Sequence, residues 1–286
     1  MTRLLEDNEM VNQSVRKKIC DLLAHIEEKN QIAVLYSCES GSRAWGFESL
    51  DSDYDVRFIY LRPAIWYLSV EPKRDVIEVT IDGEIDISGW DLRKALHLMR
   101  KSNPPLLEWL QSPIIYREKI SCVDRLRAIM PQCYSPIACY YHYLRMAEGN
   151  YREYLRGDEV WIKKYFYVLR PVLACIWIER GYGVVPIEFS ILVDRLITGN
   201  PLKHSILSLI ERKRAGDELD RGPRIPAISD FIDREIQRLS AIGELPGARL
   251  PSQSVDRVFQ QCLIEVYGDI IEPISLPDNG KAHTSG

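Results

Sequence analysis

The sequence lacks cysteine pairs, histidine clusters and long apolar runs. Its seven cysteines include no CxxC pair, and its five histidines include no HxxxH pair. This usage excludes the common zinc motifs and a disulfide framework, and it indicates reduced thiols in a cytoplasm. The opening segment has no apolar core of signal-peptide length, and no stretch reaches the ~20 apolar residues that span a bilayer. We therefore expect a soluble, cytoplasmic protein with no membrane partner.

A strong excess of charge of one sign is also missing. The chain has 37 basic and 41 acidic residues and a formal net charge of −4. This balance argues against a strongly electrostatic nucleic-acid binder but is compatible with a local basic groove. The apolar fraction of 46% and the charged fraction of 27% are ordinary for a globular protein, and 286 residues favour roughly two domains.

The first 117 residues carry signals of both helices and strands. Short apolar runs predict strands over residues 32–36, 56–60, 76–81, 84–87 and 114–116, and apolar periodicity predicts helices over residues 13–29, 92–101 and 104–111. Asp82–Gly83 predicts a β-hairpin, because both turn positions favour a positive φ. Ser88 has the spacing of a capping box before the second helix.

From about residue 118 helical signals dominate. Amphipathic runs predict helices over residues 135–156, 160–180, 186–196, 200–216, 229–242 and 254–267. We expect an α+β fold, in which residues 1–117 form a small mixed sheet flanked by helices and residues 118–275 form an all-helical domain. The polar tail at residues 276–286 is expected to be disordered.

The informative stretch for chemistry follows the first predicted strand. Gly41 lets the backbone approach a phosphate closely, and amide groups with the Ser42 hydroxyl can hold its oxygens, while Arg43 can add positive charge. Asp53 and Asp55 share one face of a predicted strand, with Cα atoms about 6.6 Å apart. Carboxylates this close repel each other unless a cation lies between them, and Mg²⁺ completes its shell with phosphates and water.

The predicted hairpin offers a third carboxylate. Polar and apolar residues alternate over 84–87, so Asp86 points away from the Ile85 and Ile87 face and can converge on Asp53 and Asp55. Glu84 lies on the same face and competes for this role, but we favour Asp86. An Asp-x-Asp alone fits a solvated loop, whereas the ordered combination of strand, Gly-Ser, Asp-x-Asp, strand and acid-bearing hairpin favours a two-metal site.

This ordered pattern resembles the DNA polymerase beta superfamily of nucleotidyltransferases. The stretches DISGWDLRKAL, KSNPPLLEWL and KYFYVLRP, which begin at residues 86, 101 and 164, are similar to the predicted nucleotidyltransferases associated with RNA-repair and RNA-ligase loci. The resemblance covers residues 33–200. It implies an NTP substrate, two Mg²⁺ ions (or Mn²⁺ in their place) and transfer of a nucleoside monophosphate with release of pyrophosphate. By this match the catalytic metal ligands are Asp53, Asp55 and Asp86, and the phosphate contacts are Gly41 and Ser42.

Several basic residues are further candidates for contacts to the nucleotide. Lys163, Tyr167 and Arg170 share a helix face at i, i+4 and i+7, which suits either a solvated face or contacts to a triphosphate or polynucleotide. The family match makes Lys164 an alternative phosphate contact. The charge run at 211–214 is interpreted as a solvated helix end. Three tryptophans are interpreted as packing residues: Trp45, Trp90 and Trp109.

The leading functional hypothesis is an enzyme that transfers a nucleotide to an RNA 3′ end during repair or end processing. The same metal core serves adenylylation of a protein or small molecule equally well, so the motif leaves the acceptor open. A non-catalytic nucleotide-binding module is the third reading. The three carboxylates argue against it, because a binding module has no need to keep them.

Overall fold

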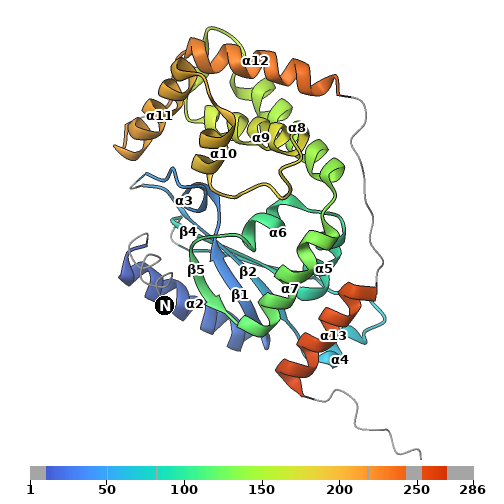
Figure 1. Cartoon of the computed structure of the whole chain (residues 1–286). Coiled ribbons are helices and arrows are strands. Elements are labelled where there is room, and N and C mark those ends of the chain that lie inside the picture. Colours follow the sequence, from blue (N-terminus) through green and yellow to red (C-terminus); the bar gives the residue numbers. More distant parts are fainter. Residues whose placement is uncertain (1–10, 50, 82, 218, 243–252, 269–286) are drawn as a thin grey trace, which may run out of the picture.

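The computed structural model describes residues 11–49, 51–81, 83–217, 219–242 and 253–268. A five-stranded sheet forms its lower part in Figure 1, in the order β3–β4–β2–β1–β5. The strands are β1 (Ala33–Glu39), β2 (Tyr54–Leu61), β3 (Val76–Ile81), β4 (Ile85–Asp91) and β5 (Ile115–Glu118). β2 and β4 run parallel and the other neighbours antiparallel. The expected small mixed sheet is confirmed.

The predicted hairpin joins β3 and β4. Its strands pair antiparallel, and Gly83 adopts a φ of 72°, in the region that favours glycine. Asp82 lies outside the described residues. The predicted helix cap at Ser88 is wrong, because Ser88 is paired with strands on both sides and β4 continues to Asp91. Asp91 itself caps the next helix and accepts a hydrogen bond from the Arg93 amide at 2.8 Å.

The two faces of the sheet bury different sets of side chains. Val56, Phe58 and Tyr60 of β2 pack with helix α2 (Gln13–Asn30) on one face. The opposite face is covered by α5 (Leu92–Arg100), α6 (Pro104–Trp109) and α7 (Ile120–Cys133), as Figure 1 shows. Because side chains alternate along a strand, Asp55 and Arg57 belong to this second face.

Helices dominate the upper part of the molecule in Figure 1. They are α8 (Pro136–Tyr154), α9 (Lys164–Glu179), α10 (Phe189–Leu196), α11 (Asn200–Arg214) and α12 (Pro226–Ser240). As expected, these helices follow the strands of the five-stranded sheet along the chain. The part is not purely helical, because β6 (Glu159–Trp161) pairs with β7 (Arg221–Pro223) in a two-stranded ribbon. This pairing, between residues 60–64 positions apart, shortens the predicted helix over 160–180.

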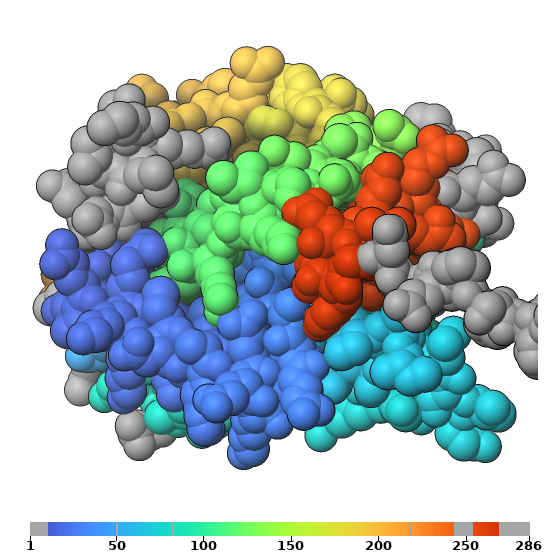
Figure 2. All heavy atoms as spheres, turned by 90° about the horizontal axis from the view of Figure 1, so that it is seen from below, coloured from blue at the N-terminus to red at the C-terminus, as the bar shows by residue number. Residues whose placement is uncertain are grey.

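The C-terminal helix α13 (Gln253–Tyr267) returns to the sheet. It packs against α7 and α5, and Figure 2 shows it between α7 and the segment around α4 (Ala64–Tyr67). The ring centroids of Tyr67 and Phe259 lie 5.0 Å apart. The core on this face of the sheet therefore includes residues from both sides of position 117. The tail at 276–286 lies outside the described residues. No helix within the described ranges is long and apolar enough to cross a bilayer.

Candidate functional site

Two acidic side chains face each other where β2 and β4 begin. Asp55 and Asp86 are direct partners in the parallel pairing of these strands. Neighbouring strands lie about 4.8 Å apart, so both carboxylates emerge together on one face. Glu84 precedes β4 and is exposed, and its carbonyl accepts a hydrogen bond from the Tyr54 amide at 2.8 Å. The register thus places Asp86, and not Glu84, beside Asp55.

Arg57 lies between these two acids and was not among the predicted site residues. Its Nη2 is 2.9 Å from Asp55 Oδ1 and 2.9 Å from Asp86 Oδ2. Its Nη1 donates to the carbonyl oxygens of Val56, at 3.0 Å, and Asp86, at 3.1 Å. The available signal was its spacing, since a residue two positions after Asp55 on a strand shares its face.

Gly41 begins the short helix α3 (Gly41–Trp45) directly against Asp55. Its φ is 58°, and a Cβ atom added there would lie 2.0 Å from Asp55 Oδ2. Glycine at this position was expected to let the backbone approach a phosphate, and in the structure its missing side chain makes room for the Asp55 carboxylate. Ser42 follows, half-buried, and its carbonyl accepts hydrogen bonds from the amides of Gly46 and Phe47, each at 3.1 Å.

Glu39 supports Asp55 from the interior and was also missed. It is fully buried, and it accepts hydrogen bonds from the Asp55 amide at 2.7 Å and from the Tyr116 hydroxyl. Burial raises the pKa of its carboxyl to about 7. The one feature of the sequence that pointed to Glu39 was the position of an acid at the end of a predicted buried strand. Glu39 connects the end of β1 to the start of β2 and so determines where Asp55 stands.

Asp53 belongs to the same electrostatic cluster. It is exposed, in the loop before β2. The pKa of Asp55 is raised first by burial, and the charges of Asp86 and Asp53 raise it further, whereas Arg57 lowers it. The donors are hard carboxylate oxygens, which match Mg²⁺ or Mn²⁺ in chemistry. Among the described residues, however, no three candidate ligands converge into a ready-made metal cage.

Arg43 holds the loop that carries Asp53. Its guanidinium donates to the carbonyl oxygens of Ser52, at 2.5 Å, and Asp53, at 3.3 Å, and lies 3.9 Å from the centroid of the Tyr54 ring. The side chain is buried. This placement differs from the predicted phosphate contact, because the guanidinium is directed at the protein's own backbone.

The start of helix α9 lies near the carboxylates. Tyr167 is half-buried, and its pKa is raised by burial and then by the charges of Asp55 and Asp53. Lys164 places its Nζ 4.9 Å from the centroid of the Tyr167 ring. Lys163 is exposed at the N-cap position. Tyr167 thus lies within electrostatic range of the acids, and Lys164 contacts its ring.

Arg170, on the same helix, lies in the interior. Its Nη1 is 2.9 Å from Glu108 Oε1, and its Nη2 donates to the Ile187 carbonyl at 3.2 Å. Glu108 also accepts hydrogen bonds from Trp45 at 3.3 Å and Tyr143 at 2.6 Å. This buried network uses the guanidinium of Arg170 to connect α9 with α6 and α3, which argues against the expected contact between Arg170 and a phosphate.

Lys213 reaches the site from α11. It is half-buried, with its Nζ 4.7 Å from the centroid of the Phe47 ring, and Arg214 donates to the Gly46 carbonyl at 2.6 Å. Burial, with a smaller contribution from the charge of Lys163, lowers the pKa of Lys213 to about 8, although the charge of Glu48 raises it in part. The interpretation of this run as a solvated helix end is therefore wrong for Lys213. No local pattern indicated that α11 would end against the segment after α3.

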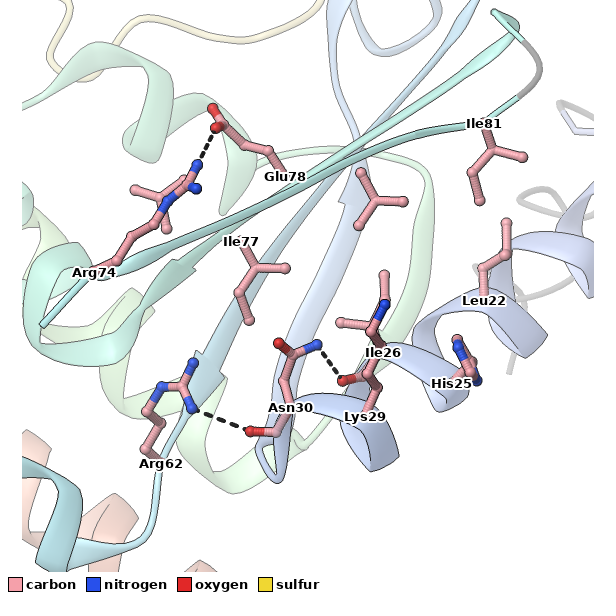
Figure 3. Close-up of a pocket in the computed structure, with 12 residues that line it drawn as sticks. Leu22, His25, Ile26, Lys29, Asn30, Arg62, Arg74, Ile77, Glu78 and Ile81 are labelled. Atoms are coloured by element: carbon pink, nitrogen blue, oxygen red, sulfur yellow. Dashed lines mark hydrogen bonds and ion pairs between the residues drawn. The ribbon is translucent and has the colours of Figure 1, made fainter.

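A separate pocket of about 360 Å³ lies between α2 and the edge strand β3 (Figure 3). Ile77 and Ile26 line it together with His25 and Arg62, and Arg62 donates to the Asn30 carbonyl at 3.1 Å. The apolar side chains of β3 there pack with the α2 face of the sheet. The pocket is thus on the opposite face from Asp55 and Asp86 and is not part of the acidic cluster.

Comparison with known proteins points to one family. The family model described as RNA repair pathway DNA polymerase beta family (RlaP) matches residues 15–261. A protein of Bacillus subtilis (strain 168) named "Uncharacterized protein YcgL" is 48% identical over 257 residues, which cover 89% of this chain and 99% of that protein. A solved nucleotidyltransferase-like protein from Exiguobacterium sibiricum 255-15 is 10% identical, with a TM-score of 0.29 over 86% of this chain and 76% of that one. A structural likeness at this level carries no argument.

Proposed function

The chain belongs to the RNA repair pathway DNA polymerase beta family, and we propose on this basis that it is a metal-dependent nucleotidyltransferase. It transfers a nucleoside monophosphate from an NTP to an acceptor hydroxyl, with RNA as the acceptor. The observation that carries this proposal is the register of β2 and β4. It sets Asp55 and Asp86 side by side, on the sheet face that turns towards the helical part.

In the proposed reaction, two Mg²⁺ ions (or Mn²⁺) would be held by Asp53, Asp55 and Asp86 and would supply charge neutralisation and activation of the attacking hydroxyl. Asp86 has the more exposed side chain of the facing pair, 47% against 32% for Asp55. Asp86 is therefore the better placed to orient the incoming hydroxyl and accept its proton. The hydroxyl oxygen forms a bond to the α-phosphorus as the bond to pyrophosphate breaks.

Cations of the helical part are proposed to hold the triphosphate. Lys163 is the N-cap of α9 and Lys164 its first residue, and Lys213 lies in the last turn of α11. Burial and, to a smaller extent, repulsion by Lys163 lower the pKa of Lys213, and phosphate oxygens between these lysines and the Gly41–Ser42 turn would offset both effects. Arg43, by contrast, acts as a positioning residue, because it holds the loop of Asp53 in place.

An acceptor screen tests the proposal. Purified protein is incubated with each labelled NTP and Mg²⁺, against RNA with a free 3′ hydroxyl, DNA, protein and no acceptor. We expect label on RNA and its loss in Asp53→Ala plus Asp55→Ala. Asp51→Asn is the matched control, because Asp51 is an exposed acid in the same loop and its loss should leave transfer intact.

The other outcomes are equally informative. Label on protein would replace RNA as the acceptor and leave the nucleotidyltransferase assignment in place. Nucleotide binding without transfer to any acceptor, unchanged by removal of Asp53 and Asp55, would overturn the proposed reaction. Comparison of Asp86→Asn with Glu84→Gln then identifies the third acid, and we expect only the Asp86 variant to lose transfer.

A further inference from the structure

The guanidinium of Arg57 occupies the space between the two facing acids. Four contacts of 2.9–3.1 Å hold it there, two to carboxylate oxygens and two to backbone carbonyls. Its side chain is only 18% exposed, so solvent and salt screen these pairs less than surface ion pairs. Arg57 is therefore a fixed part of the cluster, together with the two acids that it contacts.

The negative charges of the acids explain why the protein places the Arg57 guanidinium between them. Asp55 is partly buried and lies within electrostatic range of both Asp53 and Asp86, so the cluster contains three acids. Arg57 compensates one of these charges and leaves two. One divalent ion neutralises the two remaining negative charges. A second divalent ion then needs additional negative charge, which the phosphates of a nucleotide supply.

We propose that Arg57 is the resident counter-cation of the acidic cluster, with which a divalent ion competes for the oxygens of Asp55 and Asp86. The inference rests on the proposed function, which makes these two acids metal ligands. Arg57 holds them close together before a metal binds and weakens the binding of metal in the absence of nucleotide. It is thus a positioning residue, acting through the acids.

The test measures Mn²⁺ binding to the whole chain in the absence of nucleotide. Binding is monitored through the electron paramagnetic resonance signal of free Mn²⁺. Arg57→Met should bind Mn²⁺ at least tenfold more tightly than the wild type. Arg57→Lys should fall between them, because an ammonium keeps the charge but cannot reproduce the planar fork. Arg74→Met is the matched control, since it removes a cation from an exposed pair with Glu78 and should leave Mn²⁺ affinity unchanged.

Thermal unfolding gives a second readout. Without divalent ions Arg57→Met should melt below the wild type, because the acids lose their counter-cation, and millimolar Mg²⁺ should restore more of its Tm than it adds to the wild type. Unchanged or weaker Mn²⁺ binding by folded Arg57→Met would overturn the inference. If Asp55→Asn plus Asp86→Asn leaves wild-type Mn²⁺ binding intact, the proposed metal site itself fails, which is a different result.

Discussion

Replacement of Gly41 by alanine should damage the site far more than the fold. The new Cβ would lie 2.0 Å from Asp55 Oδ2, whereas ordinary contacts begin at 3.4 Å. Either the carboxylate or the start of α3 must therefore move by more than ~1 Å, and a displacement of this size in a reacting geometry can cost about 100-fold in rate. We expect the nucleotidyl transfer rate of Gly41→Ala to fall by about that factor.

The effect on stability should be modest. Alanine at the φ of 58° costs about 1–2 kcal/mol, because its Cβ crowds the backbone in the left-handed region. Relief of the contact with Asp55 adds to this cost, but the carboxylate is partly exposed and can rotate away. We therefore expect the free energy of unfolding, measured by urea denaturation, to fall by about 1–3 kcal/mol.

Gly46→Ala, at the C-cap of the same short helix, provides the matched control. Gly46 has a φ of 83°, and an added Cβ there would have no neighbour within 4 Å. Both variants place an alanine at a positive φ and so lose a similar amount of stability, but only Gly41→Ala disturbs Asp55. Gly46→Ala should keep wild-type transfer at a similar loss of stability. If the transfer rates of the two variants lie within threefold of each other, the proposed link between Gly41 and Asp55 is refuted.

Two further predictions concern buried charges. Arg170→Met leaves Glu108 buried without its cation and should lower the free energy of unfolding by about 3–5 kcal/mol in urea denaturation; a loss below about 1 kcal/mol would contradict the buried pair. Lys213 has a folded pKa of about 8, below its ordinary value of 10.5. Between these pH values the unfolded chain binds a proton that the native protein lacks, so the free energy of unfolding should rise with pH relative to Lys213→Met, by at most about 1.4 kcal/mol per pH unit. Parallel pH profiles of the two proteins would argue against the burial of Lys213.

Strand alternation accounts for the part of the site that sequence reasoning anticipated. Asp55 and Asp86 were placed on a common face from the periodicity of their own strands, and the register brings them together. The same rule applied to Arg57 would have placed it beside them. The misplaced cap at Ser88 shows the limit of local signals, because pairing with β2 and β3 outweighs a favourable capping sequence.

Residues on helices were harder to place. Arg170 and Lys163 share a predicted face, yet one is buried with Glu108 and the other is exposed. Helical periodicity states which side chains point the same way but not what lies opposite them. Lys213 likewise became part of the site only because α11 ends against the segment after α3.

The sequence by itself determined the α+β order of elements, the hairpin and the acid-bearing strand ends, because these follow from local periodicity and turn chemistry. The tertiary structure alone decided which basic side chains lie near the acids and which form ion pairs in the interior. It also decided why position 41 has to be glycine. These outcomes depend on contacts between distant segments, such as Gly41 with Asp55 and Arg170 with Glu108. No local pattern encodes such contacts, since they arise only when the sheet and the helices pack together.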